Sequence, residues 1–129
     1  MADTTKPKKI LIVDDDQDLL DVLTTKFTQY GFRVFQAKTG QECVASAFQF
    51  HPDLIILDNK MPGMDGMTAM SRIREDEWGK NVPIFILTGI EADDSIIQEL
   101  AKSKPAYYFK KEDIDFNELV KKVKEELKV

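Results

Sequence analysis

The sequence LIILDNKMPGMDG, from Leu54 to Gly66, joins a strongly apolar run directly to an aspartate and a tight loop. The run is short and rich in isoleucine and leucine, which favours a buried β-strand. We therefore expect Asp58 to project from the end of a rigid strand. Pro62 fixes φ, and Gly63 and Gly66 permit backbone conformations that other residues avoid, so the chain can turn back immediately after Asp58.

Short apolar runs of this kind recur along the chain and alternate with amphipathic stretches. The predicted strands cover residues 9–13, 32–37, 53–57, 82–87 and 106–109. The predicted helices cover the stretch that ends before Gly31 and residues 39–50, 67–75, 93–102 and 115–127. Strict alternation of strands and helices predicts an α/β fold, in which a parallel sheet carries helices on both faces.

Length and composition indicate one soluble domain. The 129 residues are 43% hydrophobic and 32% charged, with a net charge of −5, and this negative charge disfavours direct binding to nucleic acid. Cys43 is the single cysteine, which favours a reducing compartment. No apolar run approaches the roughly 20 residues that span a bilayer. We expect a cytoplasmic protein without membrane contact, with a flexible lead-in over residues 1–8 and one domain over residues 9–129.

Polar residues follow the predicted strands, and in a parallel α/β sheet these strand ends meet at the edge where ligands bind. They are Asp14, Asp15, Asp16, Asp58, Thr88, Gly89, Lys110 and Lys111. Two carboxylates about 4 Å apart repel by roughly 4 kcal/mol at an effective dielectric constant near 20, so such a cluster requires a cation. Oxygen ligands suit Mg²⁺ or Mn²⁺. A metal, a lysine and a carboxylate nucleophile together indicate phosphoryl transfer.

Four ordered motifs, ILIVDDD, DLIILDNKMPGMDG, PIFILTG and AYYFKK, resemble the receiver domain of two-component response regulators. The resemblance extends from Lys9 to about Leu127. It implies a single doubly wound, flavodoxin-like or CheY-like domain with five helices and a five-stranded parallel sheet in the order 2-1-3-4-5. It also implies a signalling domain whose catalysis is limited to its own phosphorylation and dephosphorylation, rather than a conventional enzyme.

The resemblance assigns a role to each strand-end residue in a reaction that requires Mg²⁺ or Mn²⁺. Asp58 would accept the phosphoryl group and bind the metal. Asp15 would bind the metal directly, Asp14 would bind it through a water molecule, and the backbone carbonyl of Lys60 would be a further ligand.

The resemblance also implies a switch on the later strands. Thr88 would hydrogen-bond the attached phosphoryl group, and Tyr107 would swing inward as Thr88 moves. Lys110 would contact the phosphoryl oxygens, because an ungapped count from Thr88 leads to it. The alternative is Lys111, with Tyr108 then as the aromatic residue.

The implied partners are a histidine kinase or histidine phosphotransfer protein as donor, and a downstream protein target. The target would bind the surface of residues 93–102, 106–109 and 115–127. The main alternative is a receiver-like interaction module that is never phosphorylated. A haloacid-dehalogenase-type phosphatase is disfavoured, because Lys60 stands where its general acid would be. A dinucleotide-binding domain is disfavoured because an acidic run, not a glycine-rich loop, follows the first strand.

Overall fold

The computed structural model describes residues 6–61, 63–89, 98 and 105–129. Five parallel strands form one sheet in the order β2-β1-β3-β4-β5, which confirms the predicted order. The strands are β1 (Lys9–Val13), β2 (Arg33–Ala37), β3 (Leu54–Asp58), β4 (Ile84–Thr88) and β5 (Tyr107–Lys110). The helices are α1 (Gln17–Gln29), α2 (Gly40–Phe50), α3 (Gly66–Arg74) and α5 (Phe116–Leu127), with short 3₁₀ helices η1 (Trp78–Lys80) and η2 (Lys111–Asp113).

The predicted α/β alternation is confirmed over the described ranges, and strand ends differ from the predictions by at most two residues. Of the helix predicted over residues 93–102, the structure describes Gln98 alone, which is helical, and the other residues of the prediction lie outside the description. The division into a lead-in over residues 1–8 and a domain over 9–129 stays a prediction, and residues 1–5 also lie outside the description. Among the described helices, none has the length and apolar character needed to cross a bilayer.

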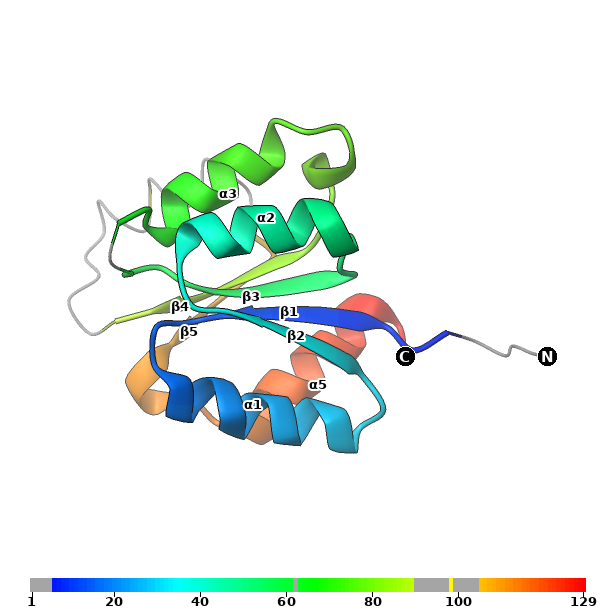
Figure 1. The fold of residues 1–129 in the computed structure, drawn as a ribbon. Helices are drawn as coiled ribbons and strands as arrows, with labels where there is room; N and C mark the ends of the chain where they lie inside the picture. The colour runs from blue at the N-terminus through cyan, green and yellow to red at the C-terminus, as the bar shows by residue number, and fades with distance from the viewer. Residues whose placement is uncertain (1–5, 62, 90–97, 99–104) are drawn as a thin grey trace.

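Helices cover both faces of the sheet, with α2 and α3 on one face and α1 and α5 on the other (Figure 1). Side chains along a strand point alternately to the two faces, so each central strand feeds two cores. In β3, for example, Ile55 and Leu57 belong to the core under α2 and α3, whereas Leu54 and Ile56 belong to the core under α1 and α5. The continuous apolar runs in the sequence therefore reflect burial on both faces.

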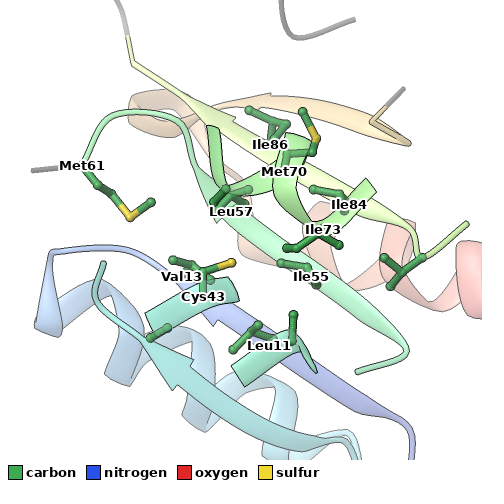
Figure 2. Packing of buried hydrophobic residues seen from close by; sticks show 14 residues of the cluster. Leu11, Val13, Cys43, Ile55, Leu57, Met61, Met70, Ile73, Ile84 and Ile86 are labelled. Carbon is green, nitrogen blue, oxygen red and sulfur yellow. The ribbon is translucent and has the colours of Figure 1, made fainter. Parts of the chain in front are cut away.

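The core under α2 and α3 extends to the loop that follows β3. Figure 2 shows the side chain of Met61 reaching from this loop over the cluster that contains Val13 and Leu57. Met61 is buried, so the loop is anchored by packing as well as by its backbone. This packing joins the described part of the loop to the core at Met61.

Each described α-helix begins at a side chain that accepts hydrogen bonds from its first turn. The capping residues are Asp16 for α1, Thr39 for α2, Asp65 for α3 and Asp115 for α5. Such caps satisfy backbone N–H groups that have no partner within the helix. Because Asp16 performs this task for α1, the carboxylates of Asp14 and Asp15 are not required for it.

Candidate functional site

The carboxyl edge of the sheet gathers polar residues from four chain segments. Asp14 and Asp15 follow β1, Asp58 ends β3, Thr88 ends β4 and Lys111 follows β5. Asp14, Asp58 and Thr88 are 0%, 3% and 5% exposed, and they are the buried polar residues of the described chain. Buried ionisable groups carry a large desolvation cost, so their convergence at one edge marks a site.

The loop after Asp58 folds back through short backbone contacts. Asn59 donates its N–H to the carbonyl of Leu87 at 3.0 Å, and Gly66 donates to the carbonyl of Asn59 at 3.0 Å. Gly63 has a φ of +75°, which favours glycine, as the sequence suggested. Gly66 is needed for a different reason, namely that a Cβ atom there would overlap the carbonyl oxygen of Asp58.

Three carboxylates converge at this edge. Asp14, Asp15 and Asp58 each offer an oxygen atom that lies within 4.8 Å of the others. Asp15 is exposed, whereas the other two are buried. This cluster contains the three side chains that the sequence proposed as metal ligands. The backbone N–H of Lys60 donates to Asp58 Oδ1 at 3.4 Å, so residue 60 adjoins the cluster, while the role of its carbonyl stays a prediction.

The lysine at the cluster is Lys111, which corrects the assignment of Lys110. Lys111 Nζ lies 2.9 Å from Asp14 Oδ2, 3.0 Å from Asp14 Oδ1 and 3.4 Å from Asp58 Oδ2. Lys110 is exposed and forms no ion pair within the described chain. The count along the sequence was one residue short.

Strand alternation gives the physical reason for this correction. Ile12 and Ile56 point into the core under α1 and α5. Asp14 and Asp58 each follow one of them by two residues, so they lie on the same face of the sheet. In β5, Phe109 packs against that same core. Lys111 follows two residues later, so its side chain lies on the same face of the sheet as Phe109. Lys110 lies on the opposite face of the sheet. The sequence alone did not distinguish Lys110 from Lys111. The segment AYYF carries large side chains on both faces of the strand, so it does not show which face packs against which core.

The same alternation separates the two candidate aromatic residues. Tyr108 packs against the core under α2 and α3, and its hydroxyl is buried without a hydrogen-bond partner in the described structure. Tyr107 is 40% exposed and lies on the α5 side, where Lys122 Nζ is 5.0 Å from its ring centroid. Tyr108 pairs in register with Ile86, two residues before Thr88, so Tyr108 and Thr88 share a sheet face.

The Thr88 hydroxyl already has a partner on the neighbouring strand. Thr88 Oγ1 donates to the backbone carbonyl of Phe109 at 3.2 Å. Thr88 is buried at the end of β4, next in the sheet to the strand that ends at Asp58. The hydroxyl is therefore held on β5 in this state of the protein.

Burial and mutual repulsion alter the ionisation of the site. Burial, followed by the charge of Asp14, raises the pKa of Asp58 to about 6, although Lys111 opposes this rise. Burial also raises the pKa of Asp14, against the hydrogen bond from Lys111. Burial alone would lower the pKa of Lys111, but its hydrogen bond to Asp14 and the charge of Asp58 raise it overall. Lys111 alone therefore does not neutralise the carboxylates of Asp14 and Asp58.

The residues present fit a hard divalent cation. Lys111 compensates one of the three carboxylate charges and leaves two uncompensated. Asp14 Oδ2 is buried, and the cation beside it among the described residues is Lys111 Nζ at 2.9 Å. An oxygen-only donor set with one exposed member, which admits water, suits Mg²⁺ or Mn²⁺ better than softer metals.

Comparisons with known proteins agree with this geometry. Residues 10–124 match the family described as response regulator receiver domain. The chain is 35% identical over 107 residues to the DNA-binding dual master transcriptional regulator RpaA of Synechocystis, covering 83% of this chain but 44% of that protein. It is 33% identical over 108 residues to sporulation initiation phosphotransferase F of Bacillus subtilis, covering 84% of this chain and 86% of that protein.

A solved structure resembles the whole domain. The receiver domain of the sensor histidine kinase PA1611 of Pseudomonas aeruginosa, with a magnesium ion coordinated in its active-site cleft, has a TM-score of 0.82 and 28% identity. The match covers 93% of this chain and 97% of that one.

Proposed function

Since the chain belongs to the response regulator receiver domain family, whose members are signalling domains, we propose that it is switched by phosphorylation of Asp58. The observation that carries this proposal is the convergence of Asp58 with two further carboxylates and the ammonium group of Lys111. A buried carboxylate beside a cation site and a lysine is equipped to receive a phosphoryl group.

In the proposed reaction, a carboxylate oxygen of Asp58 attacks the phosphorus atom of the donor. The new P–O bond forms as the bond between phosphorus and the donor's nitrogen or oxygen breaks. The leaving group keeps that electron pair and takes a proton from solvent, and the product is an acyl phosphate. The Lys111 ammonium would move from the carboxylates to a phosphoryl oxygen and compensate its charge.

A bound Mg²⁺ would offset the negative charge of the carboxylates and of the incoming phosphoryl group. We assign its side-chain ligands to Asp15 directly, Asp14 through water and Asp58, with the carbonyl of Lys60 as a further ligand. The PA1611 receiver domain holds a magnesium ion in its active-site cleft, and this supports a magnesium site in the present chain.

The switch is proposed to run from Thr88 to the aromatic residue on the same sheet face. On phosphorylation the Thr88 hydroxyl would leave the carbonyl of Phe109 and donate to a phosphoryl oxygen. The sequence analysis assigned Tyr107 as the aromatic residue that moves, because the count that led to Lys110 pairs Lys110 with Tyr107. With Lys111 at the carboxylates the paired choice is Tyr108, and its buried hydroxyl, which has no hydrogen-bond partner among the described residues, supports this choice.

The proposed donor is a histidine kinase or a histidine phosphotransfer protein. The proposed output is binding of a downstream protein to the surface of β5 and α5, together with the helix predicted over residues 93–102. The chain spans 44% of the RpaA regulator, so no activity of that whole protein is carried over. The alternative, a receiver-like module that is never phosphorylated, leaves the buried carboxylates without a purpose.

The test is intact-mass measurement after incubation with acetyl phosphate. We expect one added phosphoryl group with Mg²⁺, and none after chelation of the metal. Asp58→Asn should abolish the mass increase, whereas the matched control Asp76→Asn, a surface aspartate remote from the strand ends, should retain it. An unmodified wild-type mass under these conditions would support the interaction module instead.

A further inference from the structure

A basic groove lies at the amino edge of the sheet, opposite the carboxylates. Two hollows of about 400 and about 330 Å³ adjoin there and share Tyr30, Lys124 and Val129. Figure 1 shows why they meet, since the chain entering β1 passes beside the carboxyl end of α5. We define the basic groove by Lys6, Lys8, Tyr30, Lys121, Lys124 and Lys128.

The charge of this groove opposes that of the rest of the chain. Five lysines line the two hollows, against two acidic groups among the described lining residues, namely the side chain of Glu125 and the α-carboxylate of Val129. Glu125 lies 3.7 Å from Lys122, which compensates it. The chain as a whole carries a net charge of −5, so positive charge is concentrated here against the general trend.

These lysines are available for a ligand. Within the described residues, Lys6, Lys8, Lys121 and Lys128 form no ion pair. Like charges gathered without partners repel one another, and an anionic ligand would relieve this repulsion. The carboxyl end of α5 contributes about half a negative charge, which is far smaller than the charge of the lysines.

The groove also has an apolar floor. The ring of Tyr30 is about half exposed, and Lys124 Nζ lies 4.3 Å from its centroid. Val120 and Val129 line the hollows beside this ring. A ligand that fills the groove must therefore present apolar groups together with its negative charges, which a free phosphate ion does not.

We propose that the basic groove binds a short acidic segment of a partner protein, in which aspartate or glutamate side chains alternate with apolar ones. Carboxylates would pair with the lysines, and an apolar side chain would cover the ring of Tyr30. A long nucleic acid or an anionic membrane would also face the strongly acidic remainder of the chain, which repels them. A short peptide fits within the groove and avoids this repulsion.

The test is binding of a short fluorescent peptide that alternates glutamate and leucine, followed by anisotropy and by amide chemical shifts. We expect shift changes centred on Tyr30 and the last two turns of α5, and weaker binding at higher salt. The double variant Lys121→Gln/Lys128→Gln should weaken binding about fivefold, because each exposed charge pair contributes modestly.

The matched control is Lys38→Gln/Lys80→Gln, which removes the same charge from exposed positions outside the groove and should leave the affinity unchanged. Equal weakening by both double variants would overturn the proposal, as would the absence of binding or shift changes centred elsewhere. Tighter binding of single-stranded DNA or phosphatidylserine vesicles at the groove would overturn the assignment of a peptide partner.

Discussion

The buried carboxyl group of Asp58 opposes folding once it is ionised. Its pKa in the metal-free protein is raised to about 6, first by burial and then by the charge of Asp14. An aspartate in an unfolded chain titrates near 3.9. Between these values the folded protein holds a proton that the unfolded chain has lost. The free energy of unfolding therefore falls as pH rises from about 4 to about 6, and then stays low.

Asp58→Asn is expected to stabilise the metal-free protein at pH 7 by about 1–3 kcal/mol, because it removes a buried negative charge that destabilises the folded state. Urea unfolding in the presence of a chelator measures this. The gain should vanish near pH 3.5, where the carboxyl group is protonated in both states. Glu126→Gln, an exposed substitution on α5, should change stability by less than about 0.5 kcal/mol. A gain that persists at pH 3.5 would contradict the account.

Lys111 makes the opposite contribution. Lys111→Gln leaves Asp14 and Asp58 without their cation, so we expect the metal-free protein to lose about 1–3 kcal/mol at pH 8. Thermal or urea unfolding reports the loss. The neighbouring substitution Lys110→Gln is a matched control, since Lys110 is exposed and should tolerate the change. Equal losses in both variants would contradict the assignment of Lys111.

At this scale the sequence predicted residue types well and one position wrongly. The sequence placed Asp14, Asp15, Asp58 and Thr88 at the carboxyl edge because each follows or ends an apolar run, and the structure brings them to that edge. The lysine at the carboxylates was missed by one residue, because the face to which a side chain of an aromatic edge strand points depends on tertiary packing. The choice of Tyr107 rested on the same count, and the choice between Tyr107 and Tyr108 stays a prediction.

Among the elements, the start of α3 lies in close contact with the end of β3. Gly66 begins α3, and a Cβ atom there would overlap the Asp58 carbonyl and approach the Asn59 Cα to 2.9 Å. The backbone at Asp58 and Asn59 cannot easily move away from such an atom, because the N–H of Asn59 donates a hydrogen bond to the carbonyl of Leu87 in β4.

Gly66→Ala should therefore destabilise the fold by about 1–3 kcal/mol and slow phosphorylation by acetyl phosphate. Urea unfolding and the rate of mass increase measure the two effects. Gly89→Ala is the control for stability, since a Cβ atom there meets no atom of the described residues within 4 Å. Wild-type stability and rate in Gly66→Ala would show that the close approach has no consequence.

The elements themselves were predictable because central parallel strands read as continuous apolar runs and helices as amphipathic stretches. The physical reason for a glycine at position 66 was not predictable from the sequence. Sequence reasoning attributed it to a special φ, as holds for Gly63, whereas the cause is contact with a residue eight positions earlier.

The whole molecule is held by two apolar cores, one on each face of the sheet. Cys43 lies fully buried in the core under α2 and α3, and burial raises the pKa of its thiol to about 12. The thiolate is the reactive species, so native Cys43 should resist alkylation.

Labelling with iodoacetamide at pH 8 should proceed only as fast as the protein unfolds, and should accelerate in urea. Ala45→Cys in a Cys43→Ala background places a thiol on the exposed face of the same helix and should label at once. Rapid labelling of native Cys43 would indicate that this core opens locally without global unfolding.

At the scale of the whole chain, alternation predicted the parallel α/β layers, and the resemblance to receiver domains supplied the strand order. The basic groove was not foreseen. Its lysines come from the lead-in and from α5, and only the fold brings these two ends of the chain together.

The most direct measurement locates the phosphoryl group itself. The protein is incubated with acetyl phosphate and Mg²⁺, treated with borohydride, which reduces an aspartyl phosphate to homoserine, and sequenced by tandem mass spectrometry. We expect homoserine at residue 58 and at no other aspartate. Homoserine at another position, or no homoserine although Mg²⁺ is present, would contradict phosphorylation of Asp58.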